Sequence, residues 1–132
     1  MSIDAGKEGV LRYHVYDMTS AWDAADVTVG TATGGACEVV SIMAVADAAQ
    51  HADMDNIQVL LGASKVVELI SSVDGDELNF AATDAQATWT GSAYLRDAAT
   101  IVATMTSDGG SNASNMQIVM GYRPIVDGGH LV

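Results

Sequence analysis

Three side chains of the kind that bind metal ions stand at alternate positions near the middle of the sequence: His51, Asp53 and Asp55. In an extended segment, residues two apart point to the same side, so these three could contact one cation. Hard oxygen ligands favour Ca²⁺ or Mg²⁺. The alternative is a solvated acidic loop, and residues 74–77 (DGDE) lack the spacing of an EF-hand. We therefore predict no cofactor and keep the three residues as candidate metal ligands.

The sequence contains no recognisable catalytic motif. His14 and His130 stand near opposite ends of the chain, and neither has a serine or cysteine at a spacing typical of a hydrolase. There is no G-x-S-x-G elbow, no P-loop and no dinucleotide-binding fingerprint. Because catalytic triads are defined by geometry, a small hydrolase that uses His14 or His51 stays an alternative. We predict that the protein is not an enzyme.

Two further features could mark surface chemistry. Residues 112–114 (Asn-Ala-Ser) form an N-glycosylation sequon with Asn112 as acceptor, in a stretch rich in glycine and serine. Such tripeptides also arise by chance in turns of this composition. Trp22, Trp89 and Tyr94 could stack on sugar rings as a carbohydrate platform. The alternative use of so few aromatic side chains is the core or a subunit interface.

The net charge of the chain is −12, because seventeen acidic residues face five basic ones. This imbalance argues against direct binding to nucleic-acid phosphates. Thirteen of the acids are aspartate and only two of the bases are lysine. Short carboxylates with few lysine stems give a hydrated surface that repels itself at low salt and is tolerated when salt screens it. We predict a salt-adapted protein; the alternative is an ordinary acidic protein with a genomic bias against lysine.

The single cysteine, Cys37, excludes an intrachain disulfide. It stands in an apolar run with no histidine or lysine close by in sequence, which predicts a buried filler and not a reactive thiol. The first nine residues, MSIDAGKEG, are polar, which is not typical of a signal peptide. No apolar run reaches the about 18 residues of a transmembrane helix. We predict no membrane partner and folding in a cytoplasm.

Short runs of alternating or β-branched residues recur along the chain, and turn residues separate them roughly every 8 to 12 positions, which predicts many strands. A chain of 132 residues is long enough for one domain with a real core. This spacing of strands and turns predicts an all-β fold, which would be a single-domain antiparallel β-sandwich or jelly-roll-like barrel. The expected strands are 11–16, 26–30, 37–45, 57–61, 65–71, 98–106 and 115–124.

Between these runs the pattern is weaker. Residues 46–56 are expected to form a loop with some helical character, because they are rich in alanine. Residues 77–89 are interpreted as an irregular strand and 90–93 as a turn. The stretch 98–124 is interpreted as one long hairpin around a Gly- and Ser-rich turn, with an apolar face that other strands must cover.

These elements define three parts of the chain. We expect an N-terminal arm over residues 1–9, a β-sandwich domain over 10–124 and a C-terminal tail over 125–132, with both arms flexible. A free edge strand of such a sandwich would promote aggregation. Pairing that edge in a homo-oligomer or against a partner would remove the liability.

The run from Glu38 to Pro124 resembles the small β-sandwich decoration, or cement, proteins of tailed viruses. The likeness lies in the order of its segments: CEVVSIMAV, IQVLLG, KVVELI and ELNF, then IVATMT, a Gly-rich loop and a closing strand that ends in Tyr-Arg-Pro. Proteins of this family sit on the outside of icosahedral heads, usually as dimers or trimers. They clamp neighbouring capsid subunits together.

The resemblance implies a virion structural protein on the capsid exterior, assembled in the host cytoplasm, that stabilises the head by non-covalent contacts with the major capsid protein. It also implies a homo-oligomer, a dimer or trimer, and brings no catalytic residues. The strong acidity departs from the family pattern and fits a virus of a halophilic host. The alternative is a non-catalytic glycan- or calcium-binding β-sandwich module of a virion fibre or turret, or of a cell-surface assembly.

Overall fold

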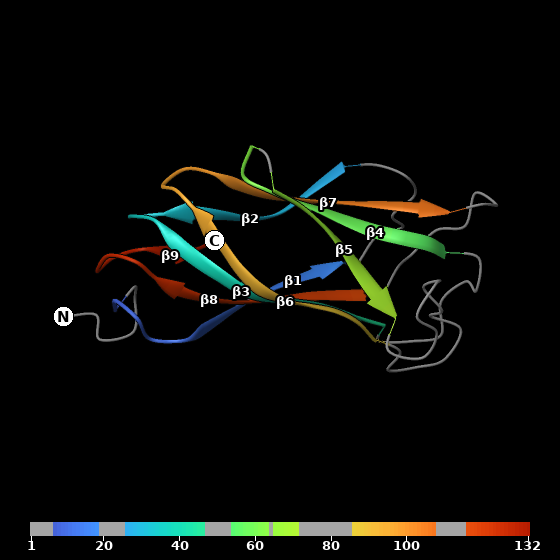
Figure 1. The fold of residues 1–132 in the computed structure, drawn as a ribbon, viewed down its shortest axis with the longest axis horizontal. Helices are drawn as coiled ribbons and strands as arrows, with labels where there is room; N and C mark the ends of the chain where they lie inside the picture. The colour runs from blue at the N-terminus through green and yellow to red at the C-terminus, as the bar shows by residue number, and fades with distance from the viewer. Residues whose placement is uncertain (1–6, 19–25, 47–53, 64, 72–85, 108–115) are drawn as a thin grey trace.

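The computed structural model describes residues 7–18, 26–46, 54–63, 65–71, 86–107 and 116–132. Within them the chain forms strands and turns only (Figure 1), and no helix is present that could cross a membrane. The strands are β1 (Arg12–Met18), β2 (Asp26–Thr33), β3 (Cys37–Ala46), β4 (Met54–Leu61), β5 (Lys65–Ser71), β6 (Gln86–Leu95), β7 (Thr100–Ser107), β8 (Met116–Pro124) and β9 (His130–Leu131).

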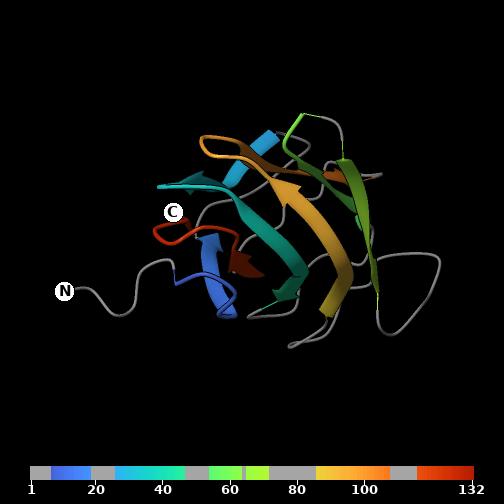
Figure 2. The same cartoon turned by 60° about the vertical axis from the view of Figure 1, so that its left-hand side comes forward.

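Eight of the strands form two antiparallel layers that face each other (Figures 1 and 2). The first layer has the order β1-β8-β3-β6 and the second β5-β4-β7-β2, while β9 extends the second layer by pairing with β2. The layers are joined where β5 pairs with β6. This strand order is that of an eight-stranded jelly roll. The prediction of an antiparallel all-β sandwich is therefore confirmed, and the sheet does not close into a barrel.

The core lies between the layers and is built almost entirely from aliphatic side chains, as the low aromatic content requires. Alternate residues of each strand point inward, so each strand contributes every second side chain to the core. Tyr122 is the one aromatic residue among the buried core residues that the structure describes. The largest fully buried side chains include Ile42, Ile57, Leu95, Ile101, Ile118 and Met120.

The strands predicted in the stretch 98–124 exist, but they do not form a hairpin with each other. β7 pairs with β2 and β4 in the second layer, whereas β8 pairs with β1 and β3 in the first. The apolar faces of β7 and β8 meet across the core. Alternation identifies a half-buried strand but does not identify its partners, and this jelly roll sends consecutive strands to opposite layers except β4 and β5.

Residues 90–93 are not a turn. They lie inside β6, where the ladder with β3 shifts register between Val39 and Ser41. Such a bulge accommodates an extra residue without ending the strand. Gly91 fits here because a Cβ at this position would lie 2.6 Å from the Trp89 ring. The glycine and serine that suggested a turn therefore belong to a bulge.

The ends of the domain are tied to the sheets. Residues 125–132, expected as a tail, include β9, and Val132 exchanges two backbone hydrogen bonds of 2.9 and 3.0 Å with Thr31 of β2. Near the N-terminus, Gly9 N–H donates to the Pro124 carbonyl at 2.9 Å. Residues 54–56, expected in a loop, belong to β4. Residues 1–6 and 72–85 lie outside the described part, so the prediction of an arm and of a strand over 77–80 stays open there.

Candidate interaction surface

The two ends of the sandwich differ in charge. β1, β3, β5 and β7 run in one direction and all finish at the same end, because each antiparallel pairing reverses the direction. The segments that connect the strands there contain eleven Asp and Glu residues and no Lys or Arg. We call this the acidic end. Its segments are 17–26, 47–55, 72–86 and 107–116.

The opposite end, which we call the arm end, holds every basic residue of the chain. These are Lys7, Arg12, Lys65, Arg96 and Arg123. The described residues of this end also include four acids, Glu8, Glu38, Asp97 and Asp127. The described part of the arm end is therefore close to neutral, whereas eleven of the seventeen acids of the sequence belong to the segments that connect the strands at the other end.

An exposed apolar surface extends from the arm end along β1. Tyr13 is 63% exposed and Val15 is 49% exposed, although both are large and apolar. Val10 and Leu11 continue this surface before β1, and Ile125 and Val126 continue it after β8. Contiguous exposed apolar patches of this kind mark interaction sites more often than scattered single residues do. The apolar patch is defined by Val10, Leu11, Tyr13, Val15, Ile125 and Val126.

Backbone hydrogen bonds hold the two segments of the patch side by side. Besides the bond from Gly9 to Pro124, Glu8 N–H donates to Asp127 Oδ1 at 2.8 Å. Ile125 N–H donates to the Ala36 carbonyl at 2.9 Å and so ties the patch to the β2–β3 turn. The patch is therefore supported by three segments that are far apart in sequence.

The middle of the outer face of the first layer continues the patch without charge. Val15, Val119, Met43 and Thr88 lie in one row across β1, β8, β3 and β6. In the neighbouring row, Gly121 lies beside Tyr13, and a Cβ on Gly121 would lie 3.2 Å from Tyr13 Cε1. The Tyr13 ring therefore approaches the strand surface at the glycine.

Charged side chains on this face lie toward its ends. Arg123 approaches Glu38 at 3.8 Å, and Ser92 Oγ donates to Glu38 Oε2 at 2.7 Å. Both groups of the ion pair are partly exposed, so the pair contributes little to stability. Its position at the arm end leaves the middle of the face free for apolar contact, while Asp17 lies on β1 toward the acidic end.

The inner side of β1 is unusual because it is the more polar side. Arg12, His14 and Tyr16 are half-buried, whereas Tyr13 and Val15 face the solvent. The His14 side chain interacts with the Val29 backbone, and a Cβ on Gly30 would lie 3.6 Å from His14 Cδ2. Burial lowers the pKa of His14, and the hydrogen bond to the Val29 backbone opposes part of this change. His14 thus joins the edge strand β1 to β2.

Both described histidines interact with backbone groups. His130 Nδ1 lies 2.9 Å from the Gly128 carbonyl oxygen, and His14 interacts with backbone. Among the described residues, neither ring is hydrogen-bonded to a serine, cysteine or carboxylate side chain. Cys37 is fully buried, and burial, with the nearby charge of Asp97, raises the pKa of its thiol. The prediction of a buried filler at Cys37 is confirmed.

The other sequence-based candidates fall mostly outside the described residues. His51, Asp53 and Asn112 lie there, and only the backbone of Asp55 is described, in β4. In the described part of the chain, no group of three His, Cys, Asp or Glu side chains could hold a metal ion. The metal and glycosylation hypotheses therefore stay predictions.

Of the three aromatic residues that could form a carbohydrate platform, the structure describes Trp89 and Tyr94. Trp89 packs against the core, whereas Tyr94 is 66% exposed at the arm end; Trp22 lies outside the described residues. The apolar patch was missed because alternation in residues 11–16 indicates a strand but not which face is buried. The residue types of Arg12, His14 and Tyr16 did not indicate that these side chains would point inward.

Comparisons with known proteins add little to this picture. No protein-family model matches the chain, and no curated protein matches it. A chain in the structure of infectious bursal disease virus, Gx strain, is similar with 10% sequence identity and a TM-score of 0.37. The match covers 94% of this chain and 40% of that one, so this chain spans less than half of its length. This is a loose likeness in fold to a virus protein.

Proposed function

We propose that this chain is a virion structural protein that decorates the outside of an icosahedral capsid and stabilises it by non-covalent contacts. In this proposal the apolar patch lies against capsid subunits and the acidic end faces the solvent. The protein performs no catalysis and takes no cofactor. Its partner is the major capsid protein, and it reaches the capsid exterior after assembly in the host cytoplasm.

The observation that carries the proposal is the orientation of β1. An isolated edge strand would normally turn Tyr13 and Val15 inward and leave its polar residues in water, because burying apolar area is favourable by about 25 cal/mol per Å². Here the apolar side chains are exposed and Arg12 is half-buried. A partner that covers the patch on binding would recover this energy.

Two further features support a capsid as that partner. The jelly roll is a fold that virus capsid domains use repeatedly, as lectin domains and cupins also do. Fold alone does not define function, so the surface must decide between these classes. A neutral, apolar end opposite a highly charged end gives a protein one preferred orientation on a larger surface, which is what decoration requires.

The finer features of the proposal follow from the same surface. A tailed virus of a halophilic host would account for an acidic end that must stay hydrated at high salt. β1 lies at the edge of its sheet. A homo-oligomer, dimer or trimer, would therefore place this edge against a second copy or against the capsid and so protect it from aggregation.

Co-sedimentation with undecorated capsids of the encoding virus tests the proposal, over salt from about 0.1 M to about 1 M, where the Debye length falls from about 10 to 3 Å. We expect saturable binding at fixed stoichiometry that persists at high salt, because the contacts are mainly apolar. Tyr13→Ser together with Val15→Thr should reduce binding at least tenfold, a loss of about 1.4 kcal/mol. Val66→Thr is the matched control, since Val66 is 57% exposed on the other layer.

Two results would contradict the proposal. The first is absence of binding at every salt concentration by a protein that circular dichroism shows to be folded. The second is binding that Val66→Thr weakens as much as the double variant of the patch does. The second outcome would move the contact to the outer face of the other layer.

A further inference from the structure

The strands β5 and β6, which join the two layers, separate toward the arm end (Figure 2). They pair only at Ile70 and Ser71, although β5 continues its ladder with β4 to Lys65 and β6 continues its ladder with β3 to Leu95. In an antiparallel ladder, every second residue directs its N–H and C=O groups away from its partner. Over residues 65–69 the described structure gives the outer edge of β5 no strand partner.

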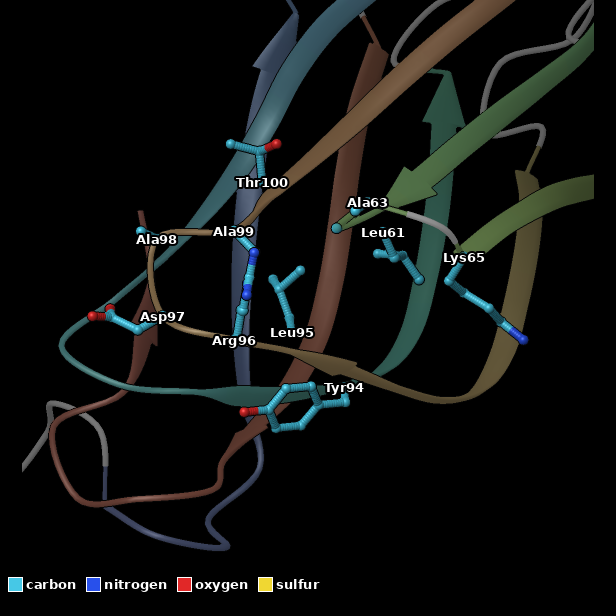
Figure 3. Close-up of a pocket in the computed structure, with 11 residues that line it drawn as sticks. Leu61, Ala63, Lys65, Tyr94, Leu95, Arg96, Asp97, Ala98, Ala99 and Thr100 are labelled. Carbon is cyan, nitrogen blue, oxygen red and sulfur yellow. The ribbon is translucent and has the colours of Figure 1, made fainter.

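A pocket of about 640 Å³ lies at the open end of this cleft (Figure 3). Buried Leu61 and Leu95 form part of its lining, together with exposed Tyr94. The volume is in the range of about 300–1,000 Å³ that is typical of ligand sites. The pocket therefore combines apolar contact area with an open strand edge.

Two of the five basic residues of the chain line this pocket, Lys65 from the start of β5 and Arg96 from the end of β6. Neither forms an ion pair with another described residue. Asp97, which also lines the pocket, accepts a hydrogen bond from Gly35 N–H at 3.3 Å, and its carboxylate points away from the side chains of Arg96 and Lys65 (Figure 3). The lining thus holds two basic side chains and one acidic side chain, and it keeps a net positive charge.

The β6–β7 turn holds Arg96 in a fixed backbone arrangement. Ala98 has a φ of 71°, in the left-handed region that non-glycine residues rarely adopt. Ala98 N–H donates to the Ala32 carbonyl at 2.8 Å, and Ala99 N–H donates to the Arg96 carbonyl at 3.0 Å. Backbone strain of this kind persists where surrounding contacts fix it, and it concentrates at binding sites.

We propose that the β5–β6 cleft binds an extended acidic segment of a partner protein, which adds as a strand to the free edge of β5. Backbone hydrogen bonds to β5 would supply affinity, as in other cases of β-strand addition. Carboxylates of the segment would pair with Lys65 and Arg96, and its apolar side chains would contact Tyr94 and Leu95. The open strand edge favours a peptide over an acidic saccharide. This site shares no residue with the apolar patch, and the inference goes beyond the proposed function.

The test is an amide NMR titration of the full chain with a blocked peptide, Ser-Asp-Val-Asp-Val-Asp-Val-Asp-Ser. We expect shifts concentrated in residues 65–71 and 90–97. Lys65→Gln together with Arg96→Gln should weaken binding at least tenfold, because two charge-assisted contacts are lost. Lys7→Gln, which removes a charge from the same end but not from the cleft, is the matched control. A peptide with asparagine in place of each aspartate should bind as weakly as the double variant does.

Three results would overturn the inference. One is the absence of chemical-shift changes in the cleft at about 1 mM peptide, a concentration at which a Kd of about 1 mM would still be detected. Another is equal binding of a peptide with proline at its centre, which cannot complete a ladder. The third is binding of a hyaluronan fragment but not of the peptide. Tyr13→Ser with Val15→Thr should leave peptide binding unchanged, so failure here and failure of capsid binding are distinguishable.

Discussion

The arm end and the acidic end of this sandwich differ in their hydrogen bonds and in their composition. At the arm end, turns from distant parts of the sequence are bonded to one another, as Gly9 is to Pro124, and apolar side chains are left exposed. The segments that connect the strands at the acidic end contain eleven acidic residues and no lysine or arginine. The exposed apolar side chains of the arm end are typical of an interaction surface. The acidic residues of the other end are typical of a surface that stays hydrated. The distribution of charge is therefore more informative than the net charge of −12.

The largest effect should come from disrupting how the arm end is assembled. A Cβ on Gly34, which has a φ of 73°, would collide with the Gly128 carbonyl oxygen and push the β2–β3 turn away from the β8–β9 connection. Gly34→Ala should lower the free energy of unfolding by about 3 kcal/mol, from backbone strain plus steric overlap. Urea denaturation followed by circular dichroism measures this change.

Gly9→Ala is the matched control for Gly34→Ala. Gly9 has a φ of 75°, but nothing lies within 4 Å of its added Cβ. Only the cost of the left-handed backbone remains, about 1 kcal/mol. Equal effects of the two substitutions would show that packing between the turns does not stabilise the arm end.

The next effect concerns the face beside the apolar patch. A Cβ on Gly121 would collide with Ser41 Oγ and approach Tyr13. Gly121→Ala should lower the free energy of unfolding by about 1–2 kcal/mol through overpacking. Adding Ser41→Ala removes the colliding hydroxyl, so the double variant should recover most of this loss. A double-mutant cycle by urea denaturation measures the coupling, and strictly additive effects would contradict the predicted contact.

Much of this architecture could be predicted from the sequence, because strand signals are local. The runs over 37–45, 57–61 and 65–71 match β3, part of β4 and β5 within a few residues. What could not be predicted is non-local. The pairing of β7 and β8 with different layers depends on the whole jelly roll, and the bulge at Gly91 looks like a turn in sequence.

The candidate sites also divide into features that the sequence could predict and features that it could not. His51 and Asp53 were predicted as site residues because their side chains can bind metal ions. The described surface is instead defined by Tyr13 and Val15, whose residue types are typical of a core. Their exposure depends on which face of β1 is turned toward β2 and the core. An alternating sequence does not determine which of its two faces is buried. The charge asymmetry could have been found from sequence alone, since every basic residue lies near the start of an odd-numbered strand or the end of an even-numbered one.

A direct test of the two ends removes one carboxylate from each. Asp17 is exposed at the acidic end, whose connecting segments contain acids and no bases in sequence, so Asp17→Asn should stabilise the protein at low salt by about 0.5 kcal/mol. Asp127 accepts the Glu8 N–H at the arm end, so Asp127→Ala, which removes both the charge and the acceptor, should destabilise the protein by about 0.5–1 kcal/mol. Thermal denaturation at low and at about 1 M salt compares them, and the Asp17 effect should vanish at high salt. The same sign for both substitutions would contradict the electrostatic contrast between the ends.

The smallest expected effect concerns His14, on the inner side of β1, the strand that runs from one end to the other. Its folded pKa is lowered from 6.5 by burial, so the fold favours the neutral ring. The stability that this provides is complete above about pH 6.5 and is lost as the pH falls through the folded pKa, because the unfolded chain then binds the proton more readily. His14→Gln should therefore flatten the fall in unfolding free energy between about pH 7 and 5, where most carboxylates stay ionised. An unchanged slope in that window would mean that the ring does not join β1 to β2 in the neutral form.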